Sequence, residues 1–193
     1  MRARGPAADD RGGGKGDNTP VREPISVTPS VKLIAAIALL AITAGAGIAL
    51  SHRTEAPEAR FVTLSGENLT GADLRGKVVL VNFWATSCAV CVEEMPMLVA
   101  TYRKFAPRGY ETVAVAMSYD HPNAVAEFAQ RHALPFKVAL DLSGEVAQRY
   151  GGIAGTPTSF IIDRRGRILK RYLGRPDEAE LHTLIGRALA DPA

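Results

Sequence analysis

Two cysteines with a redox spacing are the residues of this chain best suited to chemistry. Cys88 and Cys91 are its only cysteines, and they follow an apolar run at residues 78–81. A buried strand that leads into a helix would place the first cysteine at the helix N-terminus, where the positive end of the dipole stabilises a thiolate. The second cysteine would lie one turn further on, close enough to resolve a mixed disulfide. The spacing therefore predicts thiol–disulfide exchange.

Charge and composition exclude nucleic acid as a partner. The chain has 193 residues, 47% of them hydrophobic, and a formal net charge of +3. Basic and acidic residues are mixed through the C-terminal part, with no stripe of Lys and Arg interleaved with aromatic residues. The length is sufficient for one domain of about 130 residues with its own core, plus additional segments.

An uncharged apolar segment precedes the cysteines. Residues 33–50 contain only Leu, Ile, Ala, Gly and one Thr. As a helix this segment would reach about 27 Å, enough to cross the hydrocarbon layer, and it has no polar face of the kind that a helix of a soluble core needs. We assign a transmembrane helix to residues 31–50. A cleaved signal peptide ending at residues 44–46 is the alternative, but the long preceding segment favours a retained anchor.

The charges on either side of this segment predict its orientation. Basic residues are more frequent before it than after it, which places the N-terminus in the cytoplasm. The C-terminal domain and its cysteines would then face the compartment outside the cytoplasm, attached to the membrane by a single span. Disulfides persist in that compartment, and cytosolic electron donors cannot reach it. The basic residues concerned are Arg11, Lys15, Arg22 and Lys32 before the span, and Arg53 and Arg60 after it.

The remaining segments complete the predicted domain organisation. Residues 1–30 are rich in Gly, Pro and mixed charges and predict a disordered cytoplasmic tail, unless translation starts further along the chain. Residues 51–59 are short and polar and predict a linker. Residues 60–193 would form the folded domain.

The pattern of this domain predicts a mixed α/β fold. Strands and helices alternate first, and two strands joined by a short turn then precede a last helix that opens at Asp177 with Glu180 in a capping-box-like pair. We expect strands at residues 61–64, 78–83, 112–118, 137–140, 158–162 and 168–173, and helices after Cys91 and at residues 124–132 and 143–150.

Several motifs together resemble the thioredoxin superfamily. The sequence F-W-A-x-x-C-x-x-C at residues 83–91 follows a strand, and Gly155-Thr156-Pro157-Thr158 leads into Phe160-Ile161-Ile162-Asp163 far downstream. An extra strand and helix between residues 120 and 150, with the N-terminal apolar segment, is similar to the membrane-anchored TlpA/ResA branch. The resemblance implies a three-layer sandwich with a central mixed sheet and an inserted β-α unit.

The resemblance also implies roles for single residues. Pro157 matches a cis-proline that lies next to the cysteines, and Thr156 would offer its backbone to an extended substrate segment. Trp84 would pack beside the site and contact substrate, with an ordinary core position as the alternative. Pro96 matches a proline that kinks the active-site helix. The only redox group implied is the disulfide formed by the two cysteines, with no bound cofactor or metal.

Glu94 is the candidate for proton transfer. It lies three residues after Cys91, on nearly the same helix face. Asn82 stands where thioredoxin has a buried aspartate, and a glutamate at the position of Glu94 lies near the active site in the TlpA/ResA branch. The alternative is that Glu94, like Glu93, is only an acidic residue complementing the helix dipole.

The residues between the cysteines suggest the direction of electron flow. Ala89 and Val90 supply neither charge nor a side-chain donor, so only the helix dipole stabilises the Cys88 thiolate, which favours a reductase over a strong oxidant. The expected partners are exported proteins with disulfides, such as apocytochrome c or metal-site proteins, and a DsbD-type membrane thiol donor. Ser87 stands where many members of the family carry a second tryptophan, so the surface around the site is less aromatic here.

A Cu(I)-binding metallochaperone on the same fold is the alternative function. Relatives of that kind carry C-x-x-x-C and a histidine ligand, and the present spacing is one residue shorter. Met95 and Met97 have the spacing of helix-core residues. None of the histidines has a ligand-like spacing: they are His52, His121, His132 and His182.

Overall fold

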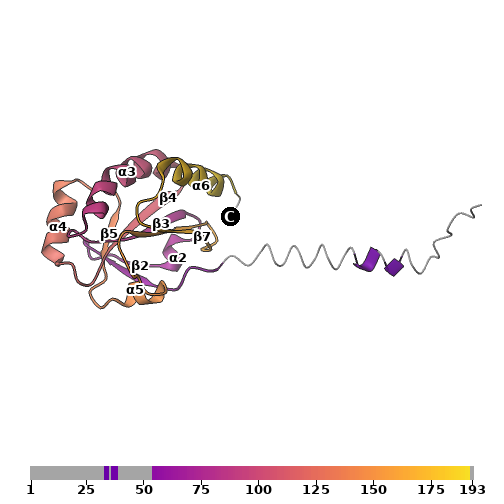
Figure 1. Cartoon of the computed structure of the whole chain (residues 1–193), viewed down its shortest axis with the longest axis horizontal. Coiled ribbons are helices and arrows are strands. Elements are labelled where there is room, and N and C mark those ends of the chain that lie inside the picture. The colour runs from indigo at the N-terminus through magenta and orange to yellow at the C-terminus, as the bar shows by residue number, and fades with distance from the viewer. Residues whose placement is uncertain (1–32, 35, 39–53, 192–193) are drawn as a thin grey trace, which may run out of the picture. The chain divides into compact units, whose positions relative to one another are not determined.

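The computed structural model describes residues 33–34, 36–38 and 54–191 (Figure 1). The chain divides into two compact units, Met1–Ala49 and Leu50–Ala193. The predicted tail, most of the predicted membrane helix and residues 51–53 of the predicted linker lie outside the described residues. Within the described ranges, no helix has both the length and the hydropathy needed to cross a membrane.

The second unit alternates strands and helices and ends in a hairpin and a helix, as the sequence predicts (Figure 1). Its strands are β1 (Arg60–Thr63), β2 (Asn68–Thr70), β3 (Val78–Trp84), β4 (Tyr110–Ala116), β5 (Lys137–Leu140), β6 (Thr158–Ile162) and β7 (Ile168–Leu173). Its helices are α2 (Gly71–Leu74), α3 (Ala89–Phe105), the 3-10 turn η1 (Ala106–Arg108), α4 (Pro122–Arg131), α5 (Glu145–Arg149) and α6 (Glu178–Ala190).

The strands form one mixed sheet in the order β2-β1-β5-β4-β3-β6-β7. β3 pairs in parallel with β4, and β4 in parallel with β5. β6 runs antiparallel to β3, and the outer strands β7, β1 and β2 are also antiparallel to their neighbours. All seven residues of β3 and of β4 are buried, as expected of strands covered on both faces. The mixed sheet predicted from the sequence is confirmed.

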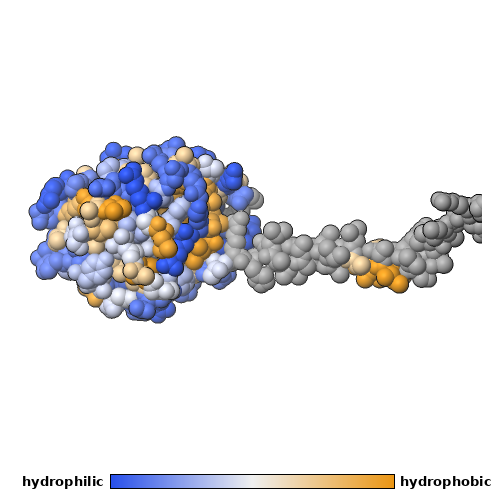
Figure 2. All heavy atoms as spheres, in the orientation of Figure 1, coloured by the Kyte–Doolittle hydropathy of each residue, from blue (hydrophilic) through white to orange (hydrophobic). Residues whose placement is uncertain are grey.

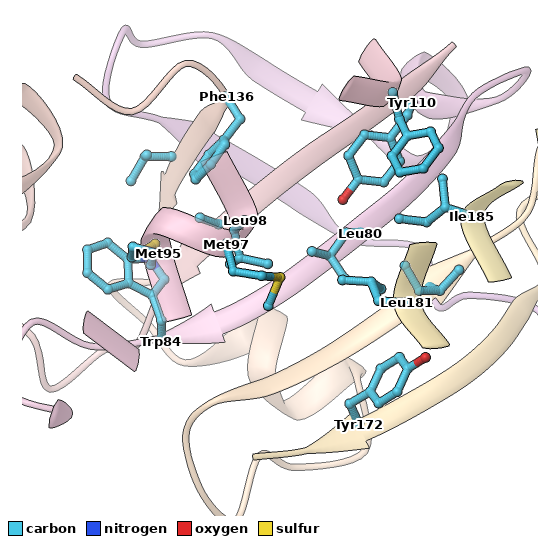
Figure 3. Packing of buried hydrophobic residues seen from close by; sticks show 14 of the residues in the cluster. Leu80, Trp84, Met95, Met97, Leu98, Tyr110, Phe136, Tyr172, Leu181 and Ile185 are labelled. Carbon is cyan, nitrogen blue, oxygen red and sulfur yellow. The ribbon is translucent and has the colours of Figure 1, made fainter. Parts of the chain in front are cut away.

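Two apolar cores lie on opposite faces of the sheet. One is built from α3, α4 and α6, and the other from α2 and α5. Side chains of β3 alternate between them, because successive residues of a strand point to opposite faces. Leu80 packs against the core under α3 and α6, which Figure 3 shows, whereas Val79 and Val81 belong to the other core. This is the three-layer arrangement expected of the fold.

The folded domain starts earlier than the sequence predicts. Residues 54–56, assigned above to a linker, lie along the turn between β6 and β7. The backbone N–H of Ile168 donates to the carbonyl of Thr54 at 2.8 Å, and that of Ala56 donates to the carbonyl of Gly166 at 2.8 Å. Glu55 forms an isolated antiparallel bridge with Arg167. Backbone pairing between residues more than 100 positions apart leaves no periodic signal in the sequence.

The packing of α6 predicts which of its residues stabilise the domain. Leu181 is fully buried between α6 and the sheet, whereas Thr183 is exposed on the same helix. Leu181→Ala should therefore lower the free energy of unfolding by about 2–5 kcal/mol in urea denaturation, because it leaves a cavity. Thr183→Ala, the control, should change it by no more than about 0.5 kcal/mol. Equal effects of the two substitutions would contradict this packing.

Candidate active site

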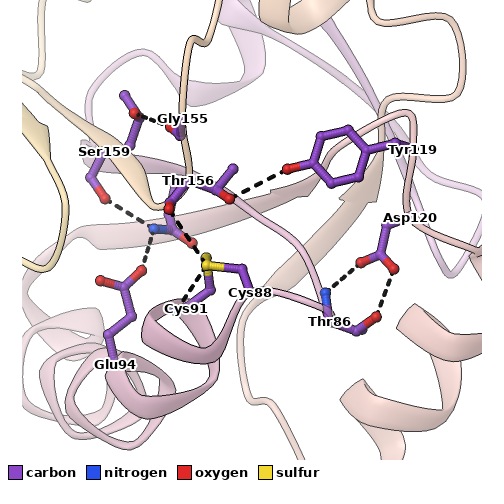
Figure 4. Close-up of a disulfide and its surroundings, with 11 residues drawn as sticks. Thr86, Cys88, Cys91, Glu94, Tyr119, Asp120, Gly155, Thr156 and Ser159 are labelled. Carbon is purple, nitrogen blue, oxygen red and sulfur yellow. Dashed lines mark hydrogen bonds between the residues drawn. A yellow bond between two sulfur atoms is a disulfide. The ribbon is translucent and has the colours of Figure 1, made fainter.

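The two cysteines form a disulfide where β3 leads into α3 (Figure 4). Cys88 is the N-cap residue of α3, and its Sγ accepts a hydrogen bond from the backbone N–H of Cys91 at 3.2 Å. Cys88 is partly exposed, whereas Cys91 is fully buried. In the reduced protein, the same N–H and the helix dipole would stabilise a thiolate on Cys88. The accessible sulfur is thus also the one best placed to attack.

The loop before β6 lies against this sulfur. The Thr156–Pro157 peptide bond is cis, as the resemblance implied. The carbonyl oxygen of Thr156 lies 3.5 Å from the Sγ of Cys88, which Figure 4 shows. On the other side, the N–H of Gly174 donates to the carbonyl of Pro157 at 2.8 Å and links this loop to the end of β7. Thr156 and Pro157 therefore lie beside the disulfide.

A buried polar cluster lies behind the disulfide. The Asn82 side chain, in the middle of β3, donates to Glu94 Oε1 at 2.8 Å and to Ser159 Oγ at 3.0 Å (Figure 4). All three residues are fully buried. Asn82 Oδ1 and Glu94 Oε2 have no hydrogen-bond partner among the described residues. The cluster can therefore accept a further donor or a water, since each of these atoms retains unused capacity.

Glu94 has the proton affinity of an acid–base group. Burial raises the pKa of its carboxyl from an ordinary value of 4.5 to about 7, while the Asn82 hydrogen bond and the charge of Arg175 act in the opposite direction. A carboxyl that titrates near neutrality can both give and take a proton. Glu94 is one helical turn from Cys91, and both are buried. Glu93, by contrast, is exposed.

Trp84 lies in the core and does not face a binding surface. Its ring has no exposed area and packs against Phe128, with ring centroids 5.1 Å apart. The prediction that Trp84 contacts substrate is therefore corrected, because a fully buried ring has no surface to offer. The alternative of a core position agrees with the structure. Pro96 lies inside α3, which continues to Phe105.

Sequence reasoning missed two residues in the loop after β4. Asp120 accepts hydrogen bonds from the backbone N–H and the hydroxyl of Thr86, both at 2.6 Å, and so holds the loop that carries Cys88. The Tyr119 hydroxyl lies 3.3 Å from the Thr156 hydroxyl, which Figure 4 shows. The signal that could have found them is topological, since the carboxyl ends of neighbouring parallel strands meet at one edge of a sheet.

The described histidines and methionines have structural surroundings. His182 lies 2.9 Å from the Thr101 hydroxyl and 3.1 Å from Lys104 Nζ, and His132 stacks on Phe128. Met95 and Met97 are buried in the core under α3. Among the described residues, no group of three or more His, Cys, Asp or Glu side chains could hold a metal ion.

Comparison with known proteins gives consistent matches. The model of the Redoxin family matches residues 52–185. The chain is similar to the thiol-disulfide oxidoreductase ResA of Bacillus thuringiensis subsp. konkukian, with 35% identity over 131 residues, 68% of this chain and 75% of that protein. The ResA protein of Bacillus subtilis is 32% identical over 133 residues, 69% of this chain and 73% of that protein.

Solved structures agree with these matches. A putative thioredoxin from Neisseria meningitidis aligns with a TM-score of 0.66 and 37% identity, covering 70% of this chain and 90% of that one. A putative thiol:disulfide interchange protein DsbE from Chlorobium tepidum aligns with a TM-score of 0.66 and 30% identity, covering 72% of this chain and 97% of that one.

The raised pKa of Glu94 predicts how stability depends on pH. The oxidised folded protein holds a proton on Glu94 up to about pH 7, whereas the unfolded chain releases it near pH 4.5. The free energy of unfolding should therefore fall as pH rises between these values, by about 3 kcal/mol from this group alone. Urea denaturation at several pH values should show this loss in the wild type and in Glu93→Gln but not in Glu94→Gln. Identical pH dependence in all three proteins would contradict the assignment.

Proposed function

The chain belongs to the Redoxin family of thioredoxin-like proteins and is a thiol-disulfide oxidoreductase, and from this premise we propose that it is a membrane-tethered reductant of disulfides in exported proteins. The observation that carries the proposal is the position of Cys88. Its sulfur is accessible, lies at the N-terminus of α3 and faces the Thr156 carbonyl, while its partner Cys91 is buried.

The reaction follows from these positions. The Cys88 thiolate attacks one sulfur of a client disulfide, so that a Cys88–client bond forms, the client bond breaks and the released client thiolate takes a proton. Cys91 then loses its proton to Glu94 and attacks the Cys88 sulfur, which forms the Cys88–Cys91 disulfide and releases the second client thiolate. Two electrons pass to the client, and a thiol donor must return them before the next cycle.

The environment of Cys88 supports electron flow from this protein to its client, that is, reduction of the client disulfide. Among described groups, the Cys91 N–H is the only hydrogen-bond donor to the Cys88 sulfur, and Ala89 and Val90 add no charge. A modestly stabilised thiolate corresponds to a reduction potential between about −270 and −180 mV, whereas strong oxidants lie near about −120 mV. A measured potential near the latter value would contradict the proposed direction.

The tether and the partners rest on the sequence. Residues 31–50 would anchor the chain in the bacterial inner membrane with the domain in the periplasm, following the apolar run and the distribution of basic residues. A DsbD-type thiol donor in the same membrane would supply electrons. Apocytochrome c cysteines and exported metal-site proteins are the proposed clients.

Exposed apolar residues around the disulfide support an extended protein segment as substrate. The surface in Figure 2 is largely hydrophilic, with separate apolar patches. Several of the large apolar residues that remain exposed in the domain lie near the disulfide end of the sheet: Val90 is 45% exposed, Tyr119 63%, Leu142 67% and Leu173 73%. Val90 separates the cysteines in sequence, and Leu173 pairs with Thr158 beside the cis-proline. These four residues, here called the apolar rim, would contact apolar side chains next to a client cysteine.

Trapping in cells tests the function directly. Cys91→Ser should leave Cys88 able to attack but unable to release its client, so that mass spectrometry would find mixed disulfides on Cys88. A chain with both cysteines replaced by serine is the matched control and should trap nothing. If Cys91→Ser traps no client, the proposed function is wrong, and a structural disulfide or a Cu(I) carrier would explain the site better.

The apolar rim predicts selective effects on protein substrates. Tyr119→Ala should slow reduction of a disulfide in an unfolded protein about fivefold, the effect of losing roughly 1 kcal/mol of aromatic contact. It should leave reduction of oxidised glutathione unchanged. Tyr119→Phe keeps the ring, and Leu64→Ala removes an exposed apolar residue directly after β1, so both should behave as the wild type. An equal loss of rate with the unfolded protein and with oxidised glutathione would mean that Tyr119 maintains the structure of its loop and does not contact substrate.

A further inference from the structure

The end of the sheet opposite the disulfide carries a cluster of arginines. Cys88 follows the C-terminal end of β3, and the turn between β6 and β7 lies at the other end, because Val79 of β3 pairs with Ile162 of β6. The length of β3, about 20 Å, separates the two ends. The turn contains Arg164, Arg165 and Arg167.

Two further arginines join this turn through specific contacts. The N–H of Gly76 donates to the Arg164 carbonyl at 2.8 Å, which holds the neighbouring Arg75 beside the turn. The Arg75 guanidinium lies directly over Gly166 in the turn, because a Cβ added at this glycine would come within 2.5 Å of it. Arg164 Nη2 donates to the carbonyl of Arg108 at 3.4 Å. We call these residues the basic pole: Arg75, Arg108, Arg164, Arg165 and Arg167.

Acidic residues neutralise this pole only in part. Asp163 pairs with Arg167 at 2.8 Å, Glu55 lies opposite Arg167 on the paired segment before β1, and Asp191 lines a hollow of about 200 Å³ beside the turn. Arg75 and Arg108 are exposed, and neither they nor Arg164 form an ion pair within the described part of the chain. Guanidinium groups present planar pairs of donors that match phosphate oxygens. The pole therefore offers unused donors of the kind that phosphate groups bind.

The chain enters the domain at the same pole. Thr54 and Ala56 are hydrogen-bonded to Ile168 and Gly166, on the turn itself. In sequence, only residues 51–53 separate Thr54 from the apolar segment 33–50. Three residues reach about 10 Å when fully extended, which is close to the distance over which surface charges act at physiological salt.

We propose that the basic pole binds the phosphate groups of anionic lipids in the membrane that holds the tether. This inference rests on the membrane tether proposed above. Each arginine held near an anionic surface strengthens binding roughly fivefold. The domain would then meet the membrane with the basic pole, and its disulfide would face away from the lipid. Lipid is favoured over free phosphate because the tether brings the pole to a surface where phosphate groups are dense.

The full chain in lipid nanodiscs tests this orientation. A gadolinium chelate on a lipid headgroup broadens nearby amide signals in NMR. With phosphatidylglycerol in the nanodisc, amides of residues 164–167 should be broadened several-fold more than amides of residues 86–90. With phosphatidylcholine alone, the tether still keeps the turn near the membrane, so this difference should remain but be clearly smaller than with phosphatidylglycerol. Equal broadening at both sites, or stronger broadening at residues 86–90, would overturn the proposal.

Charge-reversal variants test whether the lipid effect depends on the arginines of the basic pole or only on the net charge of the domain. Arg108→Glu combined with Arg165→Glu should abolish the phosphatidylglycerol effect. Arg131→Glu combined with Arg171→Glu makes the same charge change elsewhere on the surface and should keep it. Inorganic phosphate is added to phosphatidylcholine nanodiscs, with chloride at equal ionic strength as the reference. If it shifts the amide signals of residues 164–167 as much as phosphatidylglycerol does, the pole binds free phosphate and the lipid assignment is wrong.

The tether is tested separately. If the full chain is released from vesicles by alkaline carbonate, the proposed tether fails and the lipid contact with it. If it stays bound but the amides of the turn are not broadened, only the lipid contact fails. Client trapping by Cys91→Ser reports on the redox function independently of both results.

Discussion

Burial of β3 on both faces is the constraint that fixes the position of the chemistry. Its residues alternate between two separate apolar cores, so a shift of one residue would exchange every side chain between the cores. The register of the strand is therefore strongly determined. Cys88 follows the end of this strand by four residues and falls at the first turn of α3, next to Thr156. The position of the reactive sulfur is thus set by packing that extends over the whole domain.

Within this apolar strand, one polar residue stands out. Asn82 is fully buried and bonded to Glu94 and Ser159, yet its Oδ1 has no partner among the described residues. A buried polar atom left without a partner costs about 1–3 kcal/mol, and an apolar residue at this position would avoid the cost. The proposed proton transfer between Glu94 and the buried Cys91 would give a physical reason for keeping the cluster, because an entirely apolar interior would leave that thiol without an acceptor.

The fold was more predictable from the sequence than the contacts of the site. β5, β6 and β7 begin and end at the predicted residues, since runs of apolar and β-branched residues bounded by turn residues carry a strong local signal. β2 and the paired segment before β1 were missed because both are short and polar, and the segment before β1 also depends on partners more than 100 positions away. Tyr119 and Asp120 were missed for a related reason: they contact residues 37 and 34 positions away. Trp84 was misplaced because an aromatic residue near a cysteine motif suits a core as well as a surface.

The unequal exposure of the two sulfurs has a kinetic consequence. Cys88 is the accessible one, and Cys91 is buried beneath it. With the proposed partners, an electron donor and a client would therefore use the same sulfur and the same surface, and could not be bound together. The enzyme would follow ping-pong kinetics, with each partner acting as a competitive inhibitor of the other when in excess. Throughput would then depend on the ratio of the two partners, and the domain would act as a carrier that exchanges electrons with one partner at a time.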